Sequence, residues 1–100
     1  MTNILASAAV AISPFQAEVQ SRTVHIGNLD VAVTEAEFRT FFEEHCGKVV
    51  KTYITGPADG SQPMRYGFVE FERPESVTAA YALSGSLLGR YAFKVSPAKV

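Results

Sequence analysis

The sequence contains one cysteine, Cys46, so no disulfide can form within the chain. There is no Cys-x-x-Cys pair, and the only histidines are His25 and His45, which is a poor ligand set for zinc. We therefore expect no bound metal, and we interpret Cys46 as a small apolar side chain at the end of a helix. The low cysteine content fits a reducing, intracellular compartment, either the nucleus or the cytoplasm.

Long hydrophobic runs are also missing. The longest apolar stretch, Ile4–Ile12, is interrupted by Ser7 and is shorter than the ~20 residues that a membrane-spanning helix needs. No lysine or arginine precedes it, so it does not fit a secretory signal. We expect a protein that is not attached to a membrane.

The chain has little excess charge of either sign. Nine lysines and arginines face ten aspartates and glutamates, which gives a formal net charge of −1. Because phosphate neutralisation supplies most non-specific nucleic-acid affinity, any RNA binding would depend on local contacts and would be modest for this chain alone.

Catalytic signatures are absent from the sequence. It has no Gly-x-x-x-x-Gly-Lys-[Ser/Thr] loop, no His-Glu-x-x-His and no Gly-x-Ser-x-Gly. The neighbours His45 and Cys46 do not by themselves make a base–nucleophile pair. We expect no enzymatic activity and no cofactor.

Hydrophobic periodicity predicts strands over residues 22–28, 48–55, 65–72 and 91–96, and helices over 34–45 and 74–83. Thr34 and Glu37 form a capping-box pair at the start of the first helix, and Gly47 and Gly85 end the two helices. Residues 56–63 are expected to be a loop, and the connector at 86–90 has room for a small hairpin. The order β-α-β-β-α-β is typical of an α+β, ferredoxin-like fold, in which two helices cover one face of a four-stranded antiparallel sheet.

The first 21 residues are interpreted as an extension of a domain that spans residues 22–100. Their apolar side chains fall on one face of a possible short helix, which would end at Ser13-Pro14. The alternatives are a disordered tail and a helix that packs on the domain or on a partner. We expect the protein to be a monomer.

Period-two alternation assigns the strand residues to two faces of the sheet. The expected core comprises Val24, Ile26, Phe38, Phe42, Val49, Ile54, Val69, Phe71, Ala80, Leu83, Phe93 and Val95. The open face would carry His25, Lys51, Tyr53, Tyr66, Phe68 and Lys94. Exposed aromatic rings on neighbouring strands suit base stacking, which is worth roughly 1–3 kcal/mol per base.

Two segments resemble the motifs of the RNA-recognition-motif family. Val24–Leu29 is similar to the family's hexamer, and Met64–Phe71 is similar to its octamer; the resemblance covers about residues 22–97. It implies single-stranded RNA binding, with His25, Tyr66 and Phe68 at the stacking positions. Further RNA contacts are expected from the residues around these rings: Tyr53, Lys51, Arg65, Lys94 and Asn28.

Three residues of the two motifs depart from the family pattern. His25 replaces the usual phenylalanine or tyrosine of the hexamer, and Met64 and Arg65 stand where the octamer normally has a cation and then a glycine. Arg65 is expected to replace the missing cation as a phosphate partner. The segment Ser96–Lys99 is a candidate for reading base identity.

The last third of the chain resembles poly(A)-binding-protein-interacting proteins through Ala82–Gly85, Leu88–Tyr91 and Phe93–Pro97. The peptide by which that group contacts poly(A)-binding protein is not identifiable in this sequence. The alternative to RNA binding is a protein-interaction module whose sheet is covered or degenerate. Its partner would bind the acidic side of the first helix (Glu35, Glu37, Glu43 and Glu44) or the N-terminal extension.

Overall fold

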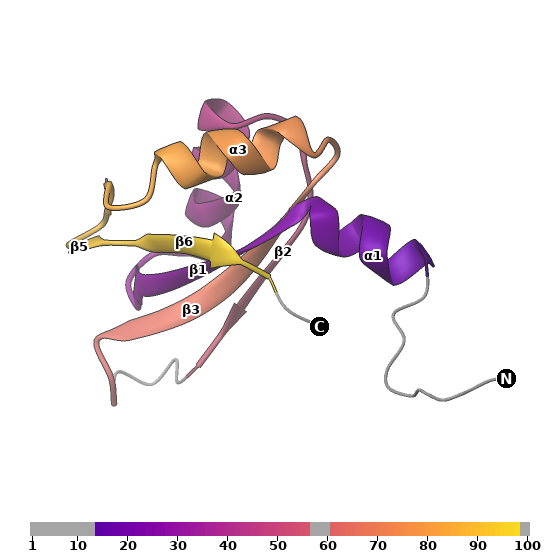
Figure 1. Ribbon diagram of the computed structural model, residues 1–100. Coiled ribbons are helices and arrows are strands. Elements are labelled where there is room, and N and C mark those ends of the chain that lie inside the picture. The colour runs from indigo at the N-terminus through magenta and orange to yellow at the C-terminus, as the bar shows by residue number, and fades with distance from the viewer. Residues whose placement is uncertain (1–13, 57–60, 99–100) are drawn as a thin grey trace, which may run out of the picture.

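The predicted sheet with helices on one face is confirmed in the computed structural model, which describes residues 14–56 and 61–98 (Figure 1). The strands are β1 (Thr23–Asp30), β2 (Val49–Thr55), β3 (Met64–Phe71), β4 (Leu87–Leu88), β5 (Tyr91–Ala92) and β6 (Lys94–Pro97). The helices are α1 (Pro14–Ser21), α2 (Glu35–His45) and α3 (Glu75–Ala82). The main sheet is antiparallel with the strand order β2-β3-β1-β6, so β1 and β3 are its central strands.

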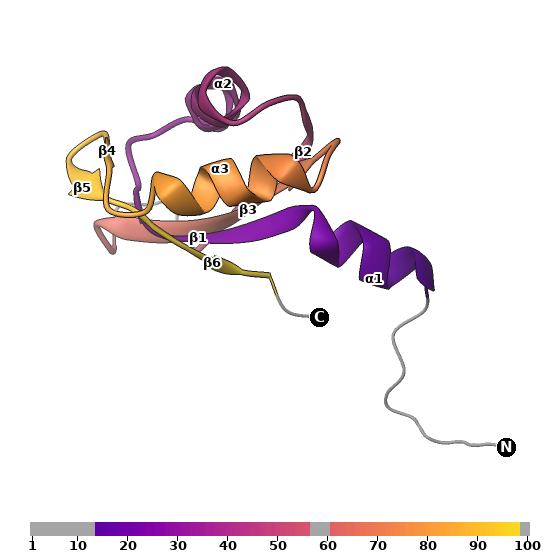
Figure 2. The ribbon, with the colours of Figure 1, turned by 45° about the horizontal axis from the view of Figure 1, so that its top comes forward.

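Both α2 and α3 lie on the same face of the main sheet (Figure 2). The capping box that the sequence predicts starts α2, because Thr34 Oγ1 accepts from the Glu37 N–H and the Glu37 carboxylate accepts from the Thr34 N–H. Between the helices and the sheet lies one cluster of buried apolar residues, which includes Phe38, Phe42 and Phe93. Neither of these two helices covers the opposite face of the sheet.

The predicted core is largely confirmed. Ile54, Leu83 and Val95 are only half-buried and pack against the edge of the cluster, whereas the other predicted core residues are buried. Leu29 and Val33 are buried as well and were not predicted. The sequence places both after the expected end of the first strand, where period-two alternation no longer applies.

The first strand runs two residues further than predicted. The chain does not turn at Asn28, because β1 continues to Asp30 through a bulge that shifts its register with β3 between Ile26 and Leu29. Asn28 adopts a left-handed conformation there with φ of 57°, which asparagine tolerates better than most residues. The extra residues bring Asp30 and Leu29 into the core.

The last strand is divided, contrary to the prediction for residues 91–96. Tyr91 and Ala92 pair with β4 in a separate hairpin, and only Lys94–Pro97 joins the main sheet beside β1. The cause is Phe93, which is fully buried and exchanges backbone hydrogen bonds with Gly85 and Ser86. The predicted hairpin exists, but it extends to Ala92.

The N-terminal helix in the structure begins at Pro14, where the sequence pattern predicts the end of a helix. Proline suits the first turn of a helix because the missing N–H would have no intrahelical partner there. The helix predicted over residues 4–12 lies outside the described residues, as does most of the predicted loop at 56–63. Figures 1 and 2 show α1 projecting beyond the end of β1 rather than lying across the sheet.

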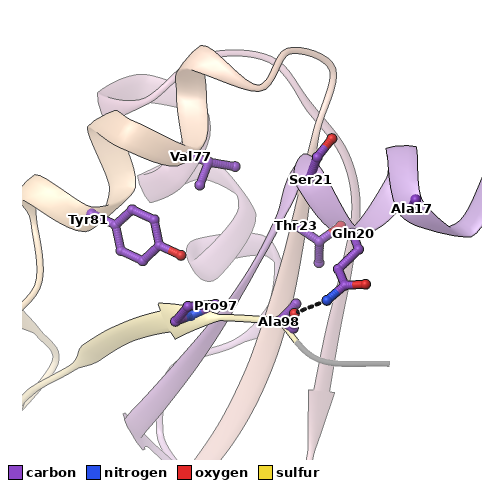
Figure 3. Close-up of a pocket in the computed structure, with 8 residues that line it drawn as sticks. All are labelled: Ala17, Gln20, Ser21, Thr23, Val77, Tyr81, Pro97 and Ala98. Carbon is purple, nitrogen blue, oxygen red and sulfur yellow. Dashed lines mark hydrogen bonds between the residues drawn. The ribbon is translucent and has the colours of Figure 1, made fainter. Parts of the chain in front are cut away.

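A groove of about 360 Å³ separates α1 from α3 above the end of β6 (Figure 3). Gln20 Nε2 donates to the carbonyl of Ala98 across it at 2.9 Å, and Thr23 Oγ1 donates to the carbonyl of Val19 at 2.6 Å. The side chains that line this groove carry no formal charge. It therefore lacks the cations that would hold a phosphate.

Candidate nucleic-acid interface

Three aromatic rings meet on the face of the sheet opposite α2 and α3. His25 of β1 is the register partner of Phe68 of β3, and Tyr66 lies two residues earlier on the same face of β3. The ring centroids are 5.5 Å apart for His25–Tyr66, 5.2 Å for His25–Phe68 and 6.3 Å for Tyr66–Phe68. We call these three residues the ring cluster.

The ring cluster is accessible in the described part of the chain. Tyr66 is 44% exposed, and His25 and Phe68 are half-buried against each other. The helices that the structure describes lie on the other face of the sheet or beyond its end (Figure 2). The covered sheet that the protein-interaction alternative requires is therefore not seen within residues 14–56 and 61–98.

Other predicted contact residues extend this surface on both sides. Tyr53 of β2 pairs with Phe68 and is 55% exposed, and the Lys51 ammonium lies 5.6 Å from the centre of the Tyr53 ring. Lys94 of β6 pairs with Gly27 and is exposed. Two lysines therefore flank the rings at opposite edges of the sheet, where they can meet the phosphates of a strand that crosses it.

The structure does not bring Arg65 to this face. Its Nη2 donates to the carbonyls of Val31 at 3.3 Å and Val33 at 3.5 Å, in the loop that leads into α2. The reason is the period of the strand, since the neighbour of Tyr66 points to the helix side of the sheet. The buried Arg65 Nε has no hydrogen-bond partner in the described residues. The position of Arg65 therefore does not support the predicted phosphate contact. Asn28, another predicted contact residue, is exposed at the bulge in β1.

An ion pair that was not predicted from the sequence lies at the end of β3. Glu70 lies on the same face as Phe68 and is paired with Arg22 at 3.1 Å. Arg22 also donates to the carbonyl of Phe71 at 2.9 Å. This pairing offsets a negative charge that would otherwise repel phosphates close to Lys51, the register partner of Glu70. Glu70 belongs to the octamer-like segment, but nothing in the sequence near Arg22 indicates that the two residues pair.

Gly67 of the octamer serves packing rather than the ligand. It lies between Tyr66 and Phe68 and faces the helices, where an added Cβ would stand 2.5 Å from the Tyr53 carbonyl oxygen and 3.1 Å from the Phe38 ring. A side chain at this position would clash with the β2 backbone at Tyr53 and would require the Phe38 ring to shift. The glycine thus lets β3 lie close to α2 while its two aromatic neighbours point to the open face.

A second unpredicted ion pair holds the β4–β5 hairpin on the end of β1. The buried Asp30 carboxylate accepts from Arg90 Nε at 2.9 Å, from Arg90 Nη2 at 2.8 Å and from the backbone N–H groups of Arg90 and Ala32. The side-chain hydrogen bond from Arg90, followed by these backbone donors, holds the pKa of Asp30 well below its usual range. The pair is structural, because its atoms are engaged with each other.

Cys46 is the C-cap residue of α2. Burial raises the pKa of the Cys46 thiol to about 11, so it is protonated near neutral pH and is not a nucleophile.

Phe41 of α2 and Leu88 of β4 line a shallow groove of about 380 Å³ together with Glu37 and Glu44 of α2. This groove lies on the helix side of the molecule, and in it two residues of the predicted acidic surface meet apolar side chains.

Comparison with known proteins places this surface in context. The family described as RNA recognition motif matches residues 24–94. Polyadenylate-binding protein-interacting protein 12 of Arabidopsis thaliana is 42% identical over 82 residues, which are 82% of this chain and 24% of that protein. Polyadenylate-binding protein 2 of Schizosaccharomyces pombe is 32% identical over 79 residues, which are 79% of this chain and 47% of that protein.

The resemblance to poly(A)-binding-protein-interacting proteins is thereby confirmed, although the chain spans about a quarter of the length of the Arabidopsis relative. Among solved structures, the Rna15 RNA recognition motif with bound RNA aligns with a TM-score of 0.67 at 23% identity, covering 79% of this chain and 84% of the other. At that identity the likeness shows the fold alone. In the described residues, no helix is both long and apolar enough to cross a membrane.

Proposed function

The chain belongs to the RNA recognition motif family, and on that basis we propose that the ring cluster binds single-stranded RNA by stacking unpaired bases. The observation that carries the proposal is the position of Tyr66 and Phe68, two large rings on the central strand of an otherwise solvated sheet face, beside His25. An exposed aromatic group of this kind offers bases a flat surface whatever their sequence.

The charges around the rings fit this ligand. Lys51 and Lys94 stand on the edge strands β2 and β6, so a strand of RNA that crosses β3 and β1 passes both ammonium groups. The chain has no net positive charge to add to them. We therefore infer an affinity that is modest and governed by stacking, with a shallow dependence on salt.

Single-stranded RNA is expected to bind at least about tenfold more tightly than the same sequence in a duplex, because paired bases cannot reach the rings. The measurement is fluorescence anisotropy with a labelled, randomised short RNA and with a labelled duplex of equal length, at low and moderate salt. Equal affinity for the two forms, or no binding to either by the folded protein, would reject the proposal.

A second candidate function is the docking of a protein on α2. We propose that the groove beside Phe41 and Leu88 takes a basic segment that inserts one apolar side chain and pairs with Glu37 and Glu44. The relatives in Arabidopsis, which are named for interacting with a polyadenylate-binding protein, support a protein partner in this group. Because these relatives are about four times longer than the matched region, the chemistry of the groove carries the proposal.

Glu44→Lys is expected to weaken binding to purified polyadenylate-binding protein by about 3- to 10-fold, because it reverses one charge at the rim of the groove. The matched control is Glu72→Lys, which reverses an exposed charge on the loop after β3. Isothermal titration calorimetry would measure both variants. The same loss in both variants, or no binding by the wild-type protein, would reject the proposal that this partner docks in the groove.

A further inference from the structure

The His25 imidazole is held from the neighbouring strand. Ser96 of β6 is the register partner of His25, and its Oγ lies 3.2 Å from His25 Nδ1. On its other sides the imidazole contacts Tyr66 in a tilted arrangement with an interplanar angle of 35° and Phe68 edge-on at 69°. These three contacts come from two different strands, and together they restrict the ring to one orientation.

The hydrogen bond to Ser96 also decides which nitrogen is available to a ligand. Nε2 of His25 makes no hydrogen bond to any residue that the structure describes, so it is the nitrogen left to contact RNA. The Ser96 hydroxyl proton likewise has no other acceptor among these residues. Donation from Ser96 Oγ to Nδ1 is the direction that uses this proton, and in that direction the proton of a neutral ring stands on Nε2.

We propose that Ser96 is a positioning residue, which fixes the orientation and tautomer of His25 so that Nε2–H donates to an acceptor on the bound nucleotide. The inference rests on the proposed RNA-binding function and adds a polar contact to the stacking surface. A phenylalanine at position 25 would stack over more area but would offer no hydrogen-bond donor. The histidine thus exchanges stacking area for a directed hydrogen bond.

The test compares Ser96→Ala, which removes the hydroxyl, with Ser96→Thr, which keeps it. Nitrogen-15 NMR of the imidazole is expected to show a single Nε2–H tautomer in the wild type and in Ser96→Thr, and a mixture in Ser96→Ala. We expect Ser96→Ala to weaken RNA binding by about 3- to 10-fold, the effect of one hydrogen bond, and Ser96→Thr to restore it. A wild-type Nδ1–H tautomer, or spectra and affinity that Ser96→Ala leaves unchanged, would overturn the proposal.

A second comparison separates positioning from a direct contact by Ser96. In a His25→Phe background, Ser96→Ala should cause no further loss of RNA affinity, because Ser96 acts through the imidazole. An equal loss in both backgrounds would show that Ser96 acts without His25 and would reject the positioning role. If RNA binding itself fails, the NMR comparison still tests whether Ser96 fixes the tautomer, so the two failures are distinguishable.

Discussion

Replacing Tyr66 and Phe68 together with alanine is expected to weaken the binding of single-stranded RNA by at least about 30-fold. Each ring supports one stacked base, and each lost stack removes roughly 1–3 kcal/mol of binding free energy. The two rings lie on one strand with centroids 6.3 Å apart, and both contact His25, so their removal also leaves the imidazole without its aromatic neighbours. Anisotropy titration with a randomised RNA pool would measure the loss.

The structure offers a matched control for this substitution. Tyr81 of α3 is 39% exposed, which is close to the 44% of Tyr66, but it lies on the helix side at the groove of Figure 3. Tyr81→Ala should leave RNA affinity unchanged. Phe68 is half-buried, so its replacement can destabilise the fold as well as remove a stacking surface. The single variant Tyr66→Ala changes only the more exposed ring, and circular dichroism would verify the fold of each variant. Unchanged affinity in the folded double variant would remove the ring cluster from the interface.

Most of the ring cluster could be predicted from the sequence, because the side chains of a strand alternate between the two faces of a sheet. Alternation alone places Tyr66 and Phe68 on one side of β3, and the octamer and hexamer motifs then bring His25 beside them. Register needed no further information, because the buried partners Val24 and Val69 face the helices in neighbouring strands. The same period places Arg65 on the helix side, where its Nη2 donates to the carbonyls of Val31 and Val33, so its position does not support the phosphate contact that the octamer pattern suggests.

The parts that the sequence did not reveal depend on contacts between distant residues. The last strand alternates in sequence through residues 91–96, yet the burial of Phe93 and its hydrogen bonds to the Gly85 and Ser86 backbone divide it into two. The link between Asp30 and Arg90 joins residues that are 60 positions apart. No residue near Asp30 or Arg90 in the sequence indicates that the two side chains pair, so the pair is seen only in the folded chain.

Asp30→Asn is expected to lower the melting temperature at neutral pH by on the order of 10 °C, because it leaves the Arg90 guanidinium without its charged acceptor. Asp30 is 1% exposed, so water cannot replace the lost interaction at the carboxylate. Asparagine keeps the size of the side chain, but it offers Arg90 one acceptor oxygen and an N–H₂ group that faces its donors. Thermal unfolding followed by circular dichroism would measure the change.

The pH dependence of this difference identifies its electrostatic origin. The pKa of Asp30 is held well below its usual range in the folded protein, first by the Arg90 side chain, whereas in the unfolded chain it returns to roughly 3.9. A carboxyl group with a depressed folded pKa contributes its full stability above the unfolded value and loses it as the pH falls toward the folded one. The gap in melting temperature between wild type and Asp30→Asn should therefore be full at pH 7 and shrink steadily below about pH 4.

The control is Glu72→Gln, which neutralises an exposed carboxylate at the end of β3 and should change the melting temperature little at any pH. A gap between wild type and Asp30→Asn that stays constant from pH 7 down to pH 2.5 would show that packing, rather than the ion pair, accounts for the loss. A gap that closes on acidification would instead establish that the charge on Asp30 holds the β4–β5 hairpin against β1. The hairpin leads directly into β6, the strand that carries Lys94 and Ser96 to the ring face, so weakening this pair should also reduce RNA affinity.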